Sequence, residues 1–504
     1  MSRAEGWTRD QIRGDGDGRA ERHAQRSRSP LPWLAAAAFL CIASLAARWP
    51  GVAMYDSVSQ YGQGIDGDYT DWHPPIMARL WSLLRLGWPG TQPMLLLQML
   101  AWWGGLGLIA AALGRRQRHG AAALVLLVGV APLGLGWATA ILKDAQMAAA
   151  LLLATGLVAW WRLDDRAVPR WAAALAGVLI AYATLVRGNA LFATVPFSFA
   201  LAHVAGARPL WQRAVLALVA MVAVIGLSPL INHRLFGAEP TQVERALPLY
   251  DMAGTAHEAG LATLPGLSAA QWREAERRGC YSPYFWNPFG EPAQCDFVGQ
   301  AVAFGDDQRP HLMRDWAAIL LAHPFAYAAH RAGHLNSNLR FWVGPGEGDA
   351  APPLVSERND LGLGAPPGPA AAALVDGGKL MALSPLGWPF LWLAVALGLL
   401  WAGMRTTSAQ GRLAFALALT AACMSASFAV VSIASDLRYH LWSMVAAALA
   451  LILMVDARAL DIRRARIAGA VVVALGVIAA LGHLGLAARI YVPVPPHIPP
   501  AAHP

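Results

Sequence analysis

Long apolar runs separated by short polar connections are the feature that most restricts the fold of this chain. About 20 consecutive apolar residues suffice for a helix to cross a bilayer, and such a helix satisfies its own backbone hydrogen bonds in lipid. Charged residues make up 14% of the chain, whereas a soluble domain carries about 25%. We therefore predict an all-α polytopic membrane protein rather than a soluble enzyme. The expected spans number about eleven, at 31–49, 92–114, 120–138, 145–161, 171–186, 189–206, 214–232, 380–402, 412–434, 441–455 and 467–488.

The arginines indicate how these spans are oriented. Arginine clusters occupy the N-terminal tail and every second connection, and the positive-inside rule places such segments in the cytoplasm. The same distribution accounts for the net charge of +8 without nucleic-acid binding. The polar lead is too long for a cleaved signal peptide, so we expect the first span to be retained. The predicted domains are a cytoplasmic Arg-rich tail at 1–30, seven spans at 31–232 with a first outer loop at 50–91, an extracytoplasmic loop domain at 233–379, four spans at 380–488 and a Pro-rich outer tail at 489–504.

The connections predicted to face outward combine acids and bases, whereas the inward ones are plain arginine clusters. Alone, an aspartate after a span is typical of a helix cap, and an arginine at a span end is typical of snorkelling. Charged groups beside hydrocarbon are costly, however, and four separate turns place them on one side. We therefore predict one shared outward-facing site. The polar residues of these turns are Asp56, Asp66, Asp68, Asp71 and His73 in the first, Lys143 and Asp144 in the second, Arg187 and Asn189 in the third, and Asp436, Arg438 and His440 in the last.

These residue types suit a reaction on a lipid-linked phosphate. The cations Lys143, Arg187 and Arg438 would bind a phosphate or pyrophosphate near the membrane surface. Asp56 is the candidate general base towards a hydroxyl, or the carboxylate that orients an acceptor. The sequence contains no Walker motif, dinucleotide-binding glycine pattern, HExxH motif or paired CxxC. Nucleotide-driven transport and zinc hydrolysis therefore lose their usual support.

The first outer loop predicts a short helix of its own. In residues 70–88 a Pro-Pro pair precedes apolar residues at helical spacing. We expect this helix to lie on the outer leaflet, with Trp81 and Trp88 as interfacial aromatics. The alternative is that the segment is the start of a tilted second span.

The long outer segment carries three further expectations. Cys280 and Cys295 would form a disulfide if the segment faces an oxidising compartment. His330 and His334 have the i, i+4 spacing of a metal pair, but no third ligand follows at a convincing spacing, so they indicate a polar helix face. Residues 344–374 are rich in Gly and Pro and are typical of a flexible linker.

Short motifs across these segments resemble the GT-C superfamily of membrane glycosyltransferases, which use polyprenyl-phosphate sugars and include protein O-mannosyltransferases. The matching motifs are "YDSVSQY" at 55–61, "WHPPIMARLWSLL" at 72–84, "LKDAQMAAALLL" at 142–153, "RGNAL" at 187–191 and "DLRYHLW" at 436–442, and "HPFAYAAHRAGHL" looks like the corresponding late outer loop. The resemblance implies a multi-pass protein of the bacterial inner membrane, an interfacial helix in the first outer loop, a small helical outer domain and inversion at the anomeric carbon.

The resemblance also implies roles for individual residues. Asp56 stands where the superfamily has its first-loop catalytic acid, and Asp144 is a candidate second acid. The donor phosphate would be held by Lys143, Arg187, Arg438 and His440, with Arg331 from the long loop, and Tyr55, Asp71 and His73 are candidate acceptor or loop contacts. Many members carry an acidic pair in the first loop, whereas here Ser57 follows Asp56. This departure leaves the metal requirement open: no cofactor is assigned, and a divalent metal stays an alternative without a ligand pattern that supports it.

Two other functions compete with this interpretation. An oligosaccharide ligase or polymerase of the O-antigen kind would use a lipid-pyrophosphate donor and rely more on the Arg and His residues of the long loop. A lipid-linked-sugar transporter or flippase without covalent chemistry would need polar residues at mid-membrane depth and discontinuous helices. The spans are nearly free of charge and the ionisable groups gather at one rim, which favours an interfacial enzyme. The expected partners are the bilayer, a polyprenyl-phosphate-linked sugar and an extracytoplasmic glycan, lipid or protein acceptor.

Overall fold

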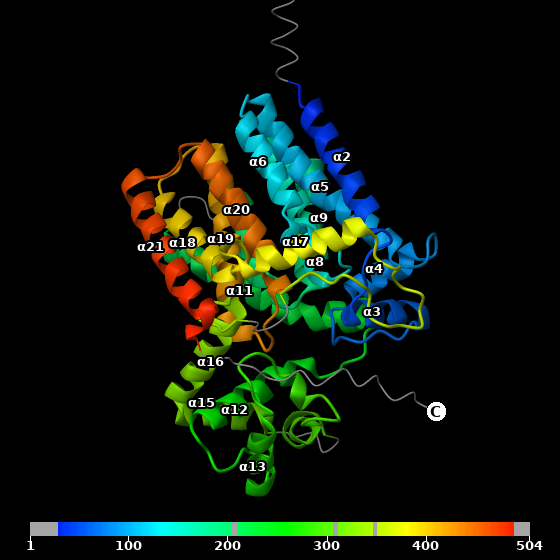
Figure 1. Ribbon diagram of the computed structural model, residues 1–504, viewed down its shortest axis with the longest axis vertical. Coiled ribbons are helices and arrows are strands. Elements are labelled where there is room, and N and C mark those ends of the chain that lie inside the picture. Colours follow the sequence, from blue (N-terminus) through cyan, green and yellow to red (C-terminus); the bar gives the residue numbers. More distant parts are fainter. Residues whose placement is uncertain (1–28, 203–208, 306–310, 346–349, 488–504) are drawn as a thin grey trace, which may run out of the picture.

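The computed structural model describes residues 29–202, 209–305, 311–345 and 350–487, and these are helical with no strand among them. The all-helical prediction is therefore confirmed for the described part of the chain. The tails at 1–30 and 489–504 lie almost wholly outside it. The helices form a bundle, and a smaller lobe lies against one end of that bundle (Figure 1).

Seven of the described helical segments are long and apolar enough to cross a membrane, which is the pattern of a multi-pass membrane protein. They are Leu31–Arg48 (α2), Gln92–Arg115 (α5), Lys143–Arg162 (α8), Trp211–Leu235 (in α11, Leu210–Pro229, and η1, Leu230–Leu235), Ala409–Val431 (α19), Leu437–Asp456 (η6, Leu437–His440, and α20, Leu441–Asp456) and Ile462–Leu486 (α21, Ile462–Leu481, and η7, Gly482–Leu486). An eighth would be the pair His119–Val130 (α6) and Pro132–Ala138 (α7), which is bent by 58°. Pro132 disfavours the helical conformation at the residue before it, and Ala131 accordingly has a ψ of 120°.

Three shorter apolar helices coincide with the remaining predicted spans. They are Arg170–Val186 (α9), Leu191–Ala202 (α10) and Pro389–Ala402 (α18). Each is shorter than the roughly 20 residues that a perpendicular span requires. The number of eleven spans therefore stays a prediction.

Helices α5 and α8 pack with their backbones in contact. A Cβ added to Gly105 would lie 2.4 Å from the backbone carbonyl oxygen of Leu152, and one added to Gly156 would lie 2.5 Å from the carbonyl oxygen of Gly105. Only glycine permits this approach, which is the small-residue packing typical of membrane helices. The contact fixes α8, whose first two residues are Lys143 and Asp144.

The first outer loop contains two helices rather than one. The expected short helix is Ile76–Leu84 (α4), and Tyr55–Asp66 (α3) is additional. Trp81 of α4 is fully buried and its indole N–H donates to the Gly90 carbonyl at 2.9 Å, so the expectation that it is an interfacial aromatic is wrong. Whether α4 lies on the outer leaflet stays a prediction.

The segment predicted as a flexible linker, residues 344–374, packs against the helix bundle. Arg48 donates to the Pro353 carbonyl at 2.7 Å, and the backbone of Ala53 binds Ser356 and Glu357. This segment then enters Pro369–Leu383 (α17), which crosses the bundle in Figure 1. The flexible-linker interpretation of 344–374 is therefore wrong for the residues of this segment that the structure describes. The expected span at 380–402 is interrupted between α17 and α18.

The lobe has a hydrophobic core of its own, separate from that of the bundle. Its helices are Val243–Arg245 (η2), Ala246–Glu258 (α12), Ala269–Arg278 (α13), Asn287–Phe289 (η3), Asp296–Gly299 (α14), Gln300–Phe304 (η4), Leu312–Ala322 (α15) and Pro324–Leu339 (α16). Cys280 and Cys295 are joined by a disulfide, as the sequence suggested. The remaining short helix, Pro385–Gly387 (η5), lies outside the lobe.

Candidate functional site

Seven charged or ionisable side chains from separate parts of the chain meet at one end of the bundle. We call them the charged cluster: Asp56, His73, Lys143, Asp144, Arg187, Asp436 and Arg438. Their side chains are 1–25% exposed. The sequence predicted that these residues share a site, and the structure brings them together.

Asp56 lies in the first turn of α3 and contacts three bases. Its Oδ2 is 3.4 Å from Lys143 Nζ and 3.3 Å from Arg438 Nη2, and its Oδ1 is 3.6 Å from His73 Nε2. Burial alone would raise the pKa of Asp56, but Lys143 and Arg438 outweigh it and hold that pKa well below its usual range. Asp56 is therefore an ionised carboxylate with cations on one side.

Ser57 links Asp56 to the start of α8. Its hydroxyl is buried and donates to the carbonyl of Ile141, two residues before Lys143. The same turn is held from α5, because Gln98 donates to the Ala140 carbonyl at 2.8 Å. The Ser57 hydroxyl thus ties the turn that carries Asp56 to the segment that leads into α8.

His73 and Lys143 form a direct hydrogen bond, with Nδ1 and Nζ 2.7 Å apart. Burial, together with the neighbouring Lys143 charge, lowers the pKa of His73 to about 3. The imidazole is therefore neutral near pH 7 and accepts from the ammonium through Nδ1. Its proton then lies on Nε2, directed at Asp56.

The innermost part of the cluster is an ion pair between Asp144 and Arg187. Asp144 is 1% exposed and lies in the first turn of α8, where a negative charge is favourable. Arg187 also donates to Asn189 at 2.6 Å, and its guanidinium lies 4.2 Å from the centre of the Tyr439 ring. Tyr439 was not among the sequence-predicted residues, although it lies within the "DLRYH" motif that supplied three of them.

Arg438 contacts all three carboxylates of the cluster. Besides Asp56, its Nε lies 2.9 Å from Asp436 Oδ2 and 3.9 Å from Asp144 Oδ2. Asp436 also accepts from the Arg438 backbone N–H at 3.0 Å and so caps η6. With His73 neutral, the cluster contains three carboxylates and three cations, so its formal charge is balanced.

Four predicted site residues do not join the cluster. Tyr55 is 77% exposed. Asp71 accepts from the Thr241 backbone N–H and hydroxyl and pairs with His233, so it fastens the first loop to the segment that follows η1. The other two, His440 and Arg331, are held by partners in the lobe.

His440 is buried and hydrogen-bonds to Asn338 of α16 at 2.6 Å. Arg331 pairs with the fully buried Asp251 and donates to the Ser432 carbonyl at 2.7 Å. Neither Asn338 nor Asp251 was a candidate, because an isolated Asn or Asp in a long segment carries no local signal of such a partner.

The lobe histidines do not form a metal site in the described residues. His330 contacts Asp251 and Tyr281, whereas His334 contacts Tyr250 and a backbone carbonyl. Across the described ranges, no group of three or more His, Cys, Asp or Glu side chains is arranged to hold a metal ion. Both histidines therefore serve the polar core of the lobe.

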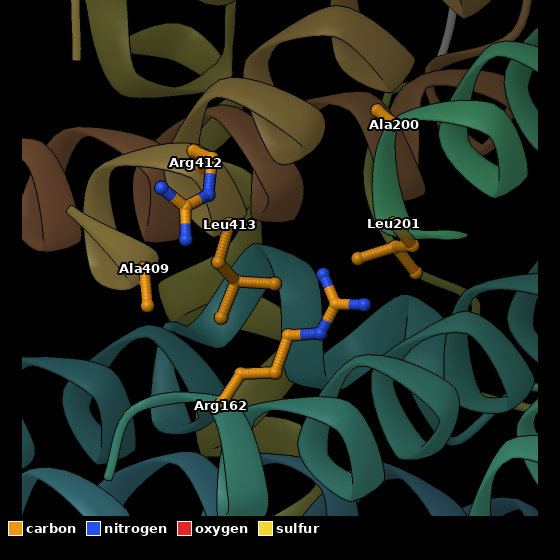
Figure 2. A pocket seen from close by; sticks show the side chains of 6 residues that line it. All are labelled: Arg162, Ala200, Leu201, Ala409, Arg412 and Leu413. Carbon is orange, nitrogen blue, oxygen red and sulfur yellow. The ribbon is translucent and has the colours of Figure 1, made fainter. Parts of the chain in front are cut away.

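A pocket at the other end of α8 is separate from the cluster. Its lining residues are Arg162, Ala200, Leu201, Ala409, Arg412 and Leu413. The two guanidinium groups point into it from α8 and α19 (Figure 2). From the length of α8, this pocket lies roughly 30 Å from Lys143, among the arginines that the sequence assigned to the opposite face.

No protein-family model, curated protein or solved structure matches this chain. The class that the fold defines is a multi-pass helical membrane protein. The charged cluster is the feature of this protein that points to a function.

Proposed function

We propose that this chain is a membrane glycosyltransferase of the GT-C type, which transfers a sugar from a polyprenyl-phosphate donor to an acceptor outside the cytoplasm. The observation that carries the proposal is the position of Asp56. A carboxylate and three bases, drawn from segments up to 382 residues apart, meet at the end of a bundle of apolar helices. Such a grouping suits a lipid that presents a phosphate beside a transferable sugar.

In the proposed reaction Asp56 accepts the proton of the acceptor hydroxyl, whose oxygen attacks the anomeric carbon of the sugar. The bond between that carbon and the phosphate oxygen breaks, and the polyprenyl phosphate leaves with the bonding electrons. Lys143 and Arg438 would stabilise the leaving phosphate, with Arg187 behind them. His73 would orient Asp56 through its Nε2 proton. Inversion at the anomeric carbon is what the resemblance implies.

The location belongs to the same proposal. The tail at 1–30 and the pocket of Figure 2 would face the cytoplasm of a bacterial cell, while the charged cluster and the lobe would face the periplasm. The disulfide in the lobe supports that orientation, because disulfides persist in oxidising compartments.

The competing ligase hypothesis loses support from the lobe. It placed the donor pyrophosphate on arginine and histidine residues of the long segment, and Arg331, His330 and His334 are instead buried in contacts with Asp251 and two tyrosines. The charges of the cluster lie at helix ends rather than in helix centres, which favours an interfacial enzyme over a transporter.

The test is transfer from a labelled polyprenyl-phosphate sugar to envelope acceptors in membranes that contain the protein. Asp56→Asn should lower the rate by about two to four orders of magnitude, the usual contribution of general acid–base catalysis. Asp68→Asn is the matched control, because it makes the same change at an exposed position of the same loop, outside the cluster. Equal rates for wild type and Asp56→Asn would overturn the proposal, as would a wild-type protein that consumes no donor from a panel of hexosyl and pentosyl polyprenyl phosphates.

A further inference from the structure

The Asp56 carboxylate occupies the place that a phosphate would need. Its Oδ2 lies between Lys143 Nζ and Arg438 Nη2, at 3.4 and 3.3 Å. These are the same two cations that the proposed function assigns to the donor phosphate. Both cations already have an anionic partner in Asp56.

The other two carboxylates of the cluster are less able to move. Asp144 is 1% exposed and pairs with Arg187. Asp436 accepts from the Arg438 backbone and lies 2.9 Å from its Nε. Asp56 stands on the short helix α3, and its Oδ1 faces the neutral His73. If one carboxylate yields to an incoming anion, it is Asp56.

We propose, on the basis of the proposed function, that Asp56 competes with the lipid phosphate for Lys143 and Arg438, and that donor binding displaces the carboxylate from both cations. The side chains of the cluster balance one another in formal charge, so a phosphate that enters it adds an uncompensated negative charge beside Asp56. Two anions that share the same cations repel each other. Displacement relieves this repulsion and leaves Asp56 with His73 alone.

Displacement also changes the chemistry of Asp56. The two cations hold the pKa of the carboxylate far below its usual range, where it is a poor base. Once they serve the phosphate, that pKa rises and the carboxylate becomes a better acceptor for the hydroxyl proton. The base is thus activated only when the donor is present, so Asp56 does not deprotonate an acceptor hydroxyl before the sugar is bound.

The experiment measures binding of undecaprenyl phosphate to the purified full-length protein in lipid nanodiscs. Asp56→Asn removes the competing charge and keeps the shape, so we expect it to bind the lipid at least about tenfold more tightly than wild type, the effect of a close charge pair. It should do so while transfer is lost. Asp68→Asn, at an exposed position of the same loop, should bind as wild type, and Lys143→Gln should bind more weakly.

The outcomes separate this inference from the proposed function. If Asp56→Asn binds no more tightly than wild type while Lys143→Gln binds weakly, the competition is wrong and the phosphate site stands. If no variant binds, or if Lys143→Gln binds as well as wild type, the cluster holds no lipid phosphate and both proposals fail. A measurement on wild type covers the case in which Asp56→Asn does not fold. Undecaprenyl phosphate should shift a carboxylate stretching band in the infrared difference spectrum, and unchanged carboxylate bands would overturn the displacement.

Discussion

Asn338 of the lobe and His440 of the bundle meet through a buried hydrogen bond of 2.6 Å. The amide nitrogen of Asn338 also donates to the Ala434 carbonyl at 3.0 Å and to the Ser432 hydroxyl at 3.2 Å. One side chain therefore holds the chain on both sides of Asp436 and Arg438. Through Asn338 the lobe therefore positions Arg438, although Asn338 does not contact Arg438 itself.

Replacing Asn338 tests this positioning role. We expect Asn338→Ala to lower kcat for sugar transfer by about tenfold to a hundredfold, the cost of a displacement near 1 Å at a reacting centre. KM for the donor lipid should change less, because Lys143 still binds the phosphate. Steady-state kinetics in nanodiscs distinguishes the two effects. Asn336→Ala, on the same helix but bonded to Trp342, should leave kcat unchanged, and an equal loss in both variants would contradict a specific role for Asn338.

The disulfide is expected to support the same loop. The segment between Cys280 and Cys295 makes two backbone hydrogen bonds with the loop at 432–436. Trp286 N–H donates to the Ile433 carbonyl at 3.0 Å, and Ser435 N–H donates to the Tyr284 carbonyl at 2.8 Å. A disulfide that closes a loop of 15 residues contributes about 3 kcal/mol to the free energy of unfolding. The double change Cys280→Ser with Cys295→Ser should lower both the melting temperature and the transfer rate.

The unpaired cysteines provide the control for that prediction. Cys41 and Cys423 are free, so their replacement by serine should leave the sensitivity to reductant unchanged. Reductant should lower the melting temperature and the activity of the wild-type protein, with loss of the disulfide verified by mass. If neither changes, the disulfide does not support the loop at 432–436.

The buried histidines predict a loss of stability in mild acid. Burial lowers the pKa of His73 and of His334 to about 3. Between pH 6.5 and that value the unfolded chain binds protons that the folded chain does not, so the free energy of unfolding falls as the pH falls. Melting curves from pH 8 to pH 5 should show this slope, and His334→Gln should flatten it. His257→Gln should not, because Glu276 raises the pKa of His257. Identical slopes in all three proteins would exclude His334 as a source.

The proposed orientation is open to a labelling test. Tyr55 is 77% exposed beside the cluster, and the side chain of Arg118 is 50% exposed at the other end of α5. In a background with Cys41→Ser and Cys423→Ser, a membrane-impermeant maleimide added to intact spheroplasts should label Tyr55→Cys and spare Arg118→Cys. Permeabilised cells should label both. The reverse pattern would invert the topology.

The residues of the cluster were predictable because charge is conspicuous in this chain. Ionised groups at the ends of apolar runs are energetically costly and therefore indicate a functional site. Four residues of the cluster have this position: Asp56, Lys143, Arg187 and Arg438. The partners of His440 and Arg331 were not predictable, because they lie far away in the sequence. His440 and Asn338 are 102 positions apart, and Arg331 meets Asp251 only when the lobe folds. Sequence neighbours say nothing of such pairs.

Helix α3 escaped prediction for a different reason. Its sequence, "YDSVSQYGQGID", contains two glycines and few strong helix formers. Its stability depends on tertiary contacts, since Tyr61 packs on Trp81 of α4 with ring centres 5.0 Å apart, and such packing outweighs intrinsic propensity in a short helix. The Asp56 carboxylate is therefore placed by a helix that only the folded chain can stabilise.

The glycine contact between α5 and α8 gives the site a remote dependence. Gly156 lies 13 residues beyond Lys143 on one continuous helix, about 20 Å along its axis. A side chain at that glycine would force two backbones apart and tilt the whole rod, carrying the lysine and its neighbouring aspartate with it. Inherited or engineered changes deep inside the helix bundle would thus inactivate the protein while every ionisable group remained chemically intact.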